Sequence, residues 1–142
     1  MVLATVLLAA VVAPACGPTM AQSDGSDSGD ARTLGPDQMT GGSVEKGRRL
    51  ARRHCARCHV IAAYNPHGGT GNAPSMDRLV TWDSGLWRIS TFFDRPPHAA
   101  IVRMQGVPRP TDLPSAAHPF ELTVAELEHI VAWARRLKAQ AQ

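Results

Sequence analysis

The chain has few aromatic residues, which make up 5% of its 142 positions, and it lacks the usual motifs of enzyme chemistry. Because no phosphate-binding glycine loop, nucleophile and base pair or paired carboxylates stand out, we expect no catalysis by this chain alone. The basic residues are not interleaved with aromatics, which argues against nucleic-acid binding. No stretch alternates like a β-strand and no internal repeat is visible, so the sequence predicts an all-α fold.

The first fifteen residues are an apolar run that no Lys or Arg precedes, ending at Ala13-Pro14-Ala15. The run is too short to span a bilayer as a lone helix, and its small final residues are typical of an export cleavage site. Residues 1–15 are therefore predicted to be an export signal, which implies a periplasmic location. Cys16 with Gly17 behind it resembles the lipobox of bacterial lipoproteins, and this implies a lipid on Cys16; the alternative is a soluble product with an unpaired cysteine.

The next segment and the rest of the chain differ in composition and charge. Residues 16–42 are rich in Ser, Asp, Gly and Pro without periodic apolar residues, which predicts a flexible tether. Residues 43–142 are predicted to form one domain. From Val44 onward there are 14 Lys and Arg residues against 8 Asp and Glu residues, so this domain should favour acidic surfaces.

Helical signals are clearest at the two ends of this domain. Ser43 is a good N-cap for an amphipathic helix that runs to the cysteine pair. Thr123-Val-Ala-Glu126 is a capping box that begins the last helix, with an apolar stripe behind it. The stripe consists of Leu127, Ile130, Val131, Ala134 and Leu137. Between these helices we expect a loop over residues 64–74, short helical pieces over 75–79 and 86–93, and an irregular proline-rich stretch over 94–119.

The segment Cys55-Ala56-Arg57-Cys58-His59 is the part of the sequence that indicates a specific chemistry. Two thiols three positions apart can each add across a vinyl group of one porphyrin, and the next histidine can place a ring nitrogen on the iron. The sequence thus predicts one haem c per chain, bound covalently by Cys55 and Cys58 with His59 on the iron. Three other interpretations of the cysteine pair are weaker. A zinc site would need four ligands, and the other histidines are scattered along the chain. A thioredoxin-like redox pair would occur in a βαβ unit, which the sequence does not predict, and a structural disulfide would close a very small loop.

With this motif, residues 43–139 resemble the class I c-type cytochromes, a family of small mono-haem proteins. The resemblance extends to Gly47 in the first helix, to Asn72-Ala-Pro74 and to the last helix around Trp133. It implies a fold in which the terminal helices cross over a covalently bound haem, with long irregular loops, and in which Gly47 packs against Trp133. It departs from the family at Leu50, where many members carry an aromatic residue, and in the loop over 94–119, which has no plain Met-Pro ligand sequence.

The resemblance also implies a sixth iron ligand from the stretch before the last helix. Met104 is the predicted ligand, because the family usually supplies a thioether and Met104 precedes loop-forming residues. His98, which follows two prolines, and His118, which precedes Pro119 and Phe120, are the alternatives, as is an open iron. The choice matters because methionine raises the reduction potential relative to a second imidazole.

These features together predict a periplasmic or membrane-tethered electron carrier. Its basic residues around the haem edge would dock onto acidic patches of a dehydrogenase, a cytochrome complex or an oxidase. These residues are Lys46, Arg48, Arg49, Arg52, Arg53 and Arg57. Two other functions stay open: a haem-based sensor or ligand-binding module, and an electron-transfer subunit of a larger oxidoreductase.

Overall fold

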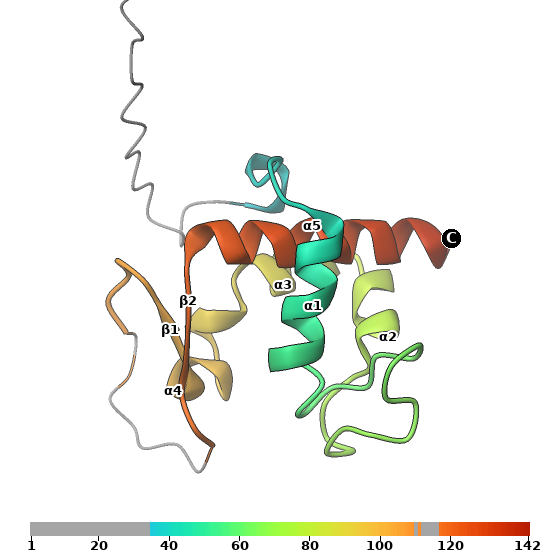
Figure 1. The fold of residues 1–142 in the computed structure, drawn as a ribbon, viewed down its shortest axis with the longest axis horizontal. Helices are drawn as coiled ribbons and strands as arrows, with labels where there is room; N and C mark the ends of the chain where they lie inside the picture. The colour runs from blue at the N-terminus through green and yellow to red at the C-terminus, as the bar shows by residue number, and fades with distance from the viewer. Residues whose placement is uncertain (1–34, 110, 112–116) are drawn as a thin grey trace, which may run out of the picture.

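The structure, a computed structural model, describes residues 35–109, 111 and 117–142, and these are mostly helical (Figure 1). This confirms the all-α prediction at the level of fold class. The elements in chain order are the 3-10 helix η1 (Pro36–Gln38), α1 (Val44–His54), α2 (Met76–Thr81), α3 (Gly85–Ser90), the 3-10 helix η2 (Phe92–Asp94), α4 (His98–Ile101), the strands β1 (Val102–Met104) and β2 (Phe120–Leu122), and α5 (Val124–Gln140).

The first and last long helices cross each other, and Figure 1 shows α1 running steeply over α5. Gly47 lies at the crossing, where an added Cβ would collide with the backbone carbonyl of His129 and the Cβ of Trp133. Only a residue without a side chain lets the two backbones come this close. The expected packing of Gly47 against Trp133 is therefore present.

Both long helices begin at the predicted caps. The Ser43 hydroxyl accepts a hydrogen bond from the backbone N–H of Lys46 at 3.4 Å. At the start of α5, the Thr123 hydroxyl accepts from the Glu126 N–H at 3.1 Å, and the Glu126 carboxylate accepts from the Thr123 N–H at 2.9 Å. This reciprocal pair is the capping box, which satisfies N–H groups that have no partner inside the helix.

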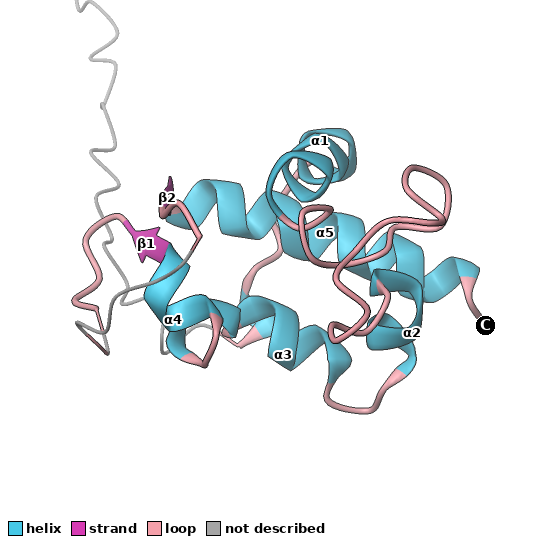
Figure 2. Ribbon diagram, turned by 90° about the horizontal axis from the view of Figure 1, so that it is seen from below, coloured by secondary structure: helices cyan, strands magenta, loops and turns pink. Residues whose placement is uncertain are grey.

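The apolar stripe of α5 forms the centre of the core. Leu127, Ile130, Val131 and Ala134 are all buried, and Leu137 packs against them at the edge. The helices α2 and α3 contact α5, and Figure 2 shows them on the side away from α1. These helices correspond to the two short pieces predicted over 75–79 and 86–93, and the loop over 64–74 contains no helix, as expected.

The expectation of no strands was wrong for two short segments. β1 and β2 pair in parallel, with Val102 opposite Phe120 and Met104 opposite Leu122. Each strand has three residues, which is too short for alternation to be recognised, and a parallel pairing joins segments far apart in sequence. The helix α4, which precedes β1, also lies in the stretch that was predicted to be irregular.

The packed part of the chain starts before the predicted boundary at residue 43. Met39 is fully buried in the hydrophobic core, and the Arg135 guanidinium donates to the Met39 carbonyl oxygen at 2.5 Å. Residues 35–42 thus belong with the folded domain and not with the tether. The predicted export signal, Cys16 and most of the predicted tether lie outside the described residues. Within the described ranges, no helix has both the length and the apolar character needed to cross a bilayer.

Candidate functional site

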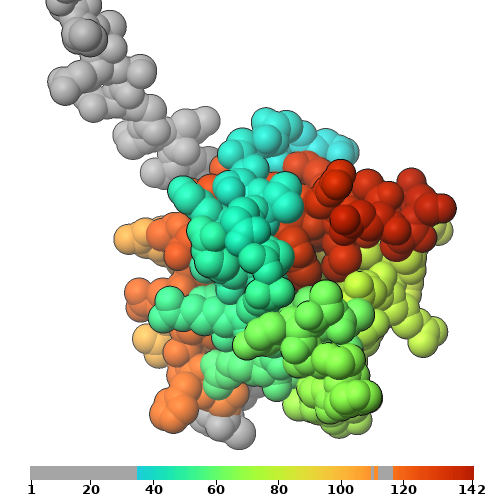
Figure 3. Space-filling view, turned by 45° about the vertical axis from the view of Figure 1, so that its right-hand side comes forward, coloured from blue at the N-terminus to red at the C-terminus, as the bar shows by residue number. Residues whose placement is uncertain are grey.

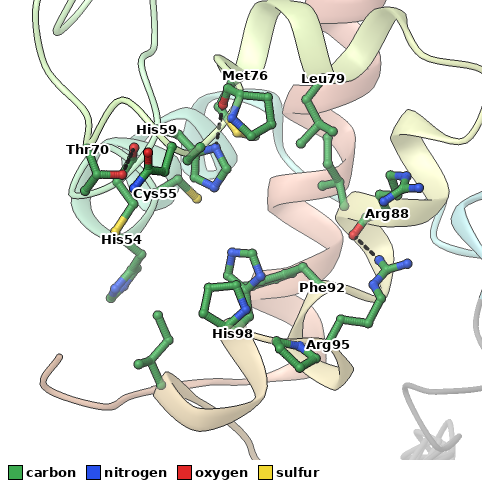
Figure 4. Close-up of a pocket in the computed structure, with 18 of the residues that line it drawn as sticks. His54, Cys55, His59, Thr70, Met76, Leu79, Arg88, Phe92, Arg95 and His98 are labelled. Atoms are coloured by element: carbon green, nitrogen blue, oxygen red, sulfur yellow. Dashed lines mark hydrogen bonds between the residues drawn. The ribbon is translucent and has the colours of Figure 1, made fainter. Parts of the chain in front are cut away.

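The cysteine motif follows directly after α1, because the helix ends at His54 and Cys55 caps it. Backbone hydrogen bonds then fold the motif into tight turns: the Cys58 and His59 N–H groups donate to the Cys55 carbonyl at 3.0 and 2.8 Å. In this arrangement Cys55, Cys58 and His59 all line one cavity (Figure 4). The structure therefore brings together the three residues that the motif predicted to act together.

His59 is held in one orientation by a residue 15 positions later. Its Nδ1 lies 2.7 Å from the carbonyl oxygen of Pro74. Because a carbonyl can only accept, Nδ1 carries a proton, and in the neutral ring the lone pair is then on Nε2. A histidine fixed in this way by a second hydrogen bond is typical of metal ligands, since the bond sets both the tautomer and the ring direction. Pro74 belongs to the stretch that the family resemblance singled out, but its contact with His59 was not predicted.

Asn65 braces the motif from the loop that follows it. Its side-chain amide donates to the carbonyl oxygens of Ala56 and His59, both at 3.1 Å, and its own side-chain oxygen accepts from the Ile61 N–H at 2.7 Å. Sequence reasoning identified this residue only as part of a turn-forming segment. An asparagine indicates a turn, and the sequence shows that much. Which backbone groups its side chain binds depends on how the loop folds, so these hydrogen bonds could not be predicted from the sequence.

The cavity has a volume of about 550 Å³, which is within the range of pockets that enclose organic ligands and cofactors. It is enclosed by the motif together with residues of α2, α3, η2 and α4. Most of its lining side chains are apolar. They include Met76, Leu79, Ile89, Phe92, Ile101, Phe120 and Ile130.

The two thiols of the motif are free and half-buried. Burial, with a smaller contribution from the neighbouring Cys58, raises the pKa of the Cys55 thiol to about 12. The Cys55 thiol is therefore protonated at neutral pH. Among the described residues, no three or more His, Cys, Asp or Glu side chains converge in the way that a metal ion held by protein ligands alone requires.

His98, at the start of α4, faces His59 across the cavity. The two rings are nearly parallel, with 7° between their planes and 6.0 Å between their centroids, and Figure 4 shows them pointing toward each other. Phe92 packs edge-on against His98 at 5.2 Å. Burial lowers the pKa of His98 to about 4, and repulsion from His59 and Arg95 acts in the same direction. His98 is thus a neutral imidazole at physiological pH.

The other two candidates for the sixth ligand lie elsewhere. Met104 is a buried residue of β1 within the hydrophobic core, and its side chain is not part of the cavity lining. His118 is exposed, and its backbone carbonyl accepts a hydrogen bond from the Arg57 guanidinium at 3.5 Å. Met76 does line the cavity, but on the same side as His59 (Figure 4). The geometry therefore favours His98 over Met104 and His118.

Two arginines lie on the side of the cavity opposite Cys55, as Figure 4 shows for Arg88 and Arg95. An Arg95 nitrogen donates to the Arg88 carbonyl at 2.7 Å and to the Thr91 hydroxyl at 2.8 Å. Each guanidinium also covers an aromatic ring, Arg88 at 5.6 Å from Trp82 and Arg95 at 4.6 Å from Trp87. These contacts hold two cations at one edge of a mostly apolar cavity.

The predicted basic surface of α1 is partly engaged within the protein. Glu45 forms ion pairs with Arg48 at 2.6 Å and with Arg49 at 3.2 Å, and the Arg52 guanidinium lies 4.9 Å from the Tyr64 ring. Figure 3 shows α1 on the outside of the molecule, where its outer face is open. Three of the six basic residues predicted to contact a partner are exposed and make none of these contacts with Glu45 or Tyr64. They are Lys46, Arg53 and Arg57.

Comparison with known proteins found no family model that matches the chain, and no curated protein or solved structure that is significantly similar to it.

Proposed function

We propose that this chain is a c-type cytochrome that carries one covalently attached haem and transfers single electrons. The observation that carries this proposal is the arrangement of the motif at the cavity. Cys55 and Cys58 present free thiols, and His59 is held by Pro74 with its second nitrogen free. These are the groups needed to attach a haem and to bind its iron from one side.

The cavity fits a haem group in size, polarity and charge. Its apolar walls and volume suit a porphyrin, which is largely apolar, and Arg88 and Arg95 lie at one edge, where they would pair with the porphyrin carboxylates. Each cysteine would form a thioether by adding its S–H across a vinyl group, a step that needs no oxidant. When bound, the haem supplies a one-electron redox centre. The protein's part is to hold it, exclude water from it and direct His59 at the iron.

Electron exchange with partners would take place where the motif reaches the surface. Arg57 lies inside the motif and is exposed, and Lys46 and Arg53 are exposed on the adjoining helix. A basic surface at this point suits acidic redox partners such as a dehydrogenase, a cytochrome complex or an oxidase. The predicted export signal and Cys16 support a periplasmic location, with the protein either soluble or tethered by a lipid.

The proposal is tested by the mass and the spectrum of the purified protein. The chain is expressed with its own leader in a bacterium that attaches haem to exported proteins. We expect a mass increase of one haem that survives acid and organic solvent, with a pyridine haemochrome spectrum of the c type. The same mass would show whether Cys16 carries a lipid.

The matched control replaces both motif cysteines, as Cys55→Ser with Cys58→Ser. The double variant should lose covalent haem while His59 and the cavity are unchanged in sequence. A wild-type protein that carries zinc, or no added mass at all, would contradict the proposal.

A further inference from the structure

We infer that His98 is the second axial ligand, so that the iron is bound by two imidazoles, His59 and His98. This inference rests on the proposed function and names the ligand that the sequence left open. The first observation is the separation of the two rings, whose centroids lie 6.0 Å apart. A metal–imidazole bond is about 2 Å long and a ring nitrogen lies about 1 Å from the centre of its ring, so two imidazoles on one metal have centres roughly 6 Å apart.

The second observation is that the His98 ring has nothing else to bind. It is half-buried in the cavity wall and packs edge-on against Phe92, and none of the described residues forms a hydrogen bond with its ring nitrogens. The ring nitrogens open onto the cavity and no group of the described chain occupies them, so the unprotonated nitrogen is available to a metal there. Coordination to the iron would satisfy one of these nitrogens.

The position of His98 is set by the surrounding backbone. The Ala99 N–H donates to the Arg95 carbonyl at 3.0 Å, and the Ala100 N–H donates to the Pro97 carbonyl at 3.2 Å. The short helix then continues directly into β1, which is paired with β2. The backbone around His98 is thus fixed by the turn at its N-terminal side and by the β1–β2 pairing at its C-terminal side. This fixes the position of its side chain at the cavity, as a preorganised ligand requires.

The same pairing keeps the rival methionine away. Met104 is the last residue of β1, opposite Leu122, and the next N–H, that of Gln105, donates to the Leu122 carbonyl at 2.9 Å. To reach the iron, Met104 would have to leave the core and break this ladder. His98 reaches the cavity without any rearrangement.

Two imidazole ligands have two consequences for function. The reduction potential should be lower than with histidine and methionine, so the partner that reduces this protein needs a correspondingly lower potential. The iron also has no open position, which favours an electron carrier over a gas-binding sensor.

The experiment compares the holoprotein with four variants, after the mass has confirmed one covalent haem. Magnetic circular dichroism in the near infrared, electron paramagnetic resonance of the oxidised state and redox titration are recorded for each. The wild type should be low-spin without the thioether-to-iron charge-transfer band. His98→Met should gain that band and show a higher potential, while His98→Ala should become high-spin and bind CO when reduced.

The control variant is Met104→Leu, which keeps the volume of a core side chain and removes its sulfur. We expect its spectra and potential to equal those of the wild type. A thioether band in the wild type that disappears in Met104→Leu would overturn the inference, as would a high-spin wild type. If the His98 variants do not mature, the wild-type and Met104→Leu spectra still decide whether Met104 is the ligand. His118→Ala then separates the two histidines: it should keep the wild-type spectra, and loss of its low-spin state would overturn the inference. A protein without covalent haem would instead refute the proposed function, and the inference would fall with it.

Discussion

Gly47 is the residue on which the crossing of α1 and α5 depends. An alanine at this position would raise the intrinsic helix propensity of α1 by about 1 kcal/mol. Its Cβ, however, would occupy the space of the His129 carbonyl and contact the Trp133 Cβ; the first is backbone of α5, and the second is bonded directly to that backbone. The overlap cannot be relieved by a side-chain rotation, so the helices would have to move apart.

We therefore expect Gly47→Ala to destabilise the holoprotein by about 1–3 kcal/mol, the usual cost of overpacking, despite the gain in propensity. Thermal unfolding followed by far-ultraviolet circular dichroism would measure the change. Lys46→Ala, on the exposed side of the same helix, is the control and should leave the unfolding temperature nearly unchanged. Equal stability of Gly47→Ala and wild type would show that the crossing is looser than the structure indicates.

His54 makes the stability of the protein depend on pH. Its ring stacks on Phe120 at 4.3 Å, and burial lowers its pKa below the ordinary value of 6.5, with Arg53 adding repulsion. The unfolded chain therefore takes up a proton here more readily than the folded protein. This contribution to stability is complete above the ordinary pKa and is lost as the pH falls through it toward the folded pKa.

Replacing His54 with Phe should keep the stacking and remove the titration. We expect the unfolding temperature of His54→Phe to decline less than that of the wild type between about pH 7 and pH 5. The measurement is a series of thermal melts of the holoprotein across this range. Parallel pH profiles for the two proteins would exclude His54 as the source of the dependence.

At the scale of elements, α5 begins with a capping box that can be tested by itself. Thr123→Ala removes the hydroxyl that accepts from the Glu126 N–H, and leaves that N–H without a partner in the first turn. A loss of about 1 kcal/mol is expected, because that is the typical cost of removing an N-cap side chain. Chemical denaturation at fixed pH gives the value. Thr123→Ser retains the hydroxyl and should recover most of the stability; failure to recover it would point to the methyl group instead.

At the scale of the whole molecule, the uneven spread of charge predicts how partners approach. Exposed charges interact over about 8–10 Å at moderate salt, so a docking step that depends on them should slow as ionic strength rises. We expect the rate of electron transfer to an acidic redox protein to fall steeply with salt. Stopped-flow mixing over a range of salt concentrations measures this slope.

A pair of charge reversals locates the docking surface. Arg53→Glu, on the exposed face of α1 next to the motif, should lower the rate and flatten its salt dependence. Arg136→Glu changes the net charge equally but lies on α5, outside the cavity lining, and should have a smaller effect. Equal effects of both variants would mean that only the net charge matters.

Much of the fold could be predicted because its signals are local. The capping box at Thr123 and Glu126, the N-cap at Ser43 and the stripe of α5 depend on spacings of one or two helical turns, which the sequence shows directly. The two strands and α4 were missed, because three or four residues carry too little pattern and their stability comes from packing. The burial of Met39 was missed for the same reason, since nothing in its neighbours marks it as a core residue.

The sequence by itself determined which groups form the site, because Cys55, Cys58 and His59 are so close along the chain that their spacing alone brings them together. It could not determine what lies across the cavity. Pro74 reaches His59 only through a folded loop. Whether His98 or Met104 faces His59 across the cavity depends on the pairing of Met104 with Leu122, 18 residues later. Contacts between residues this far apart in the sequence depend on the packing of the whole domain. Only the tertiary structure therefore placed His98 opposite His59.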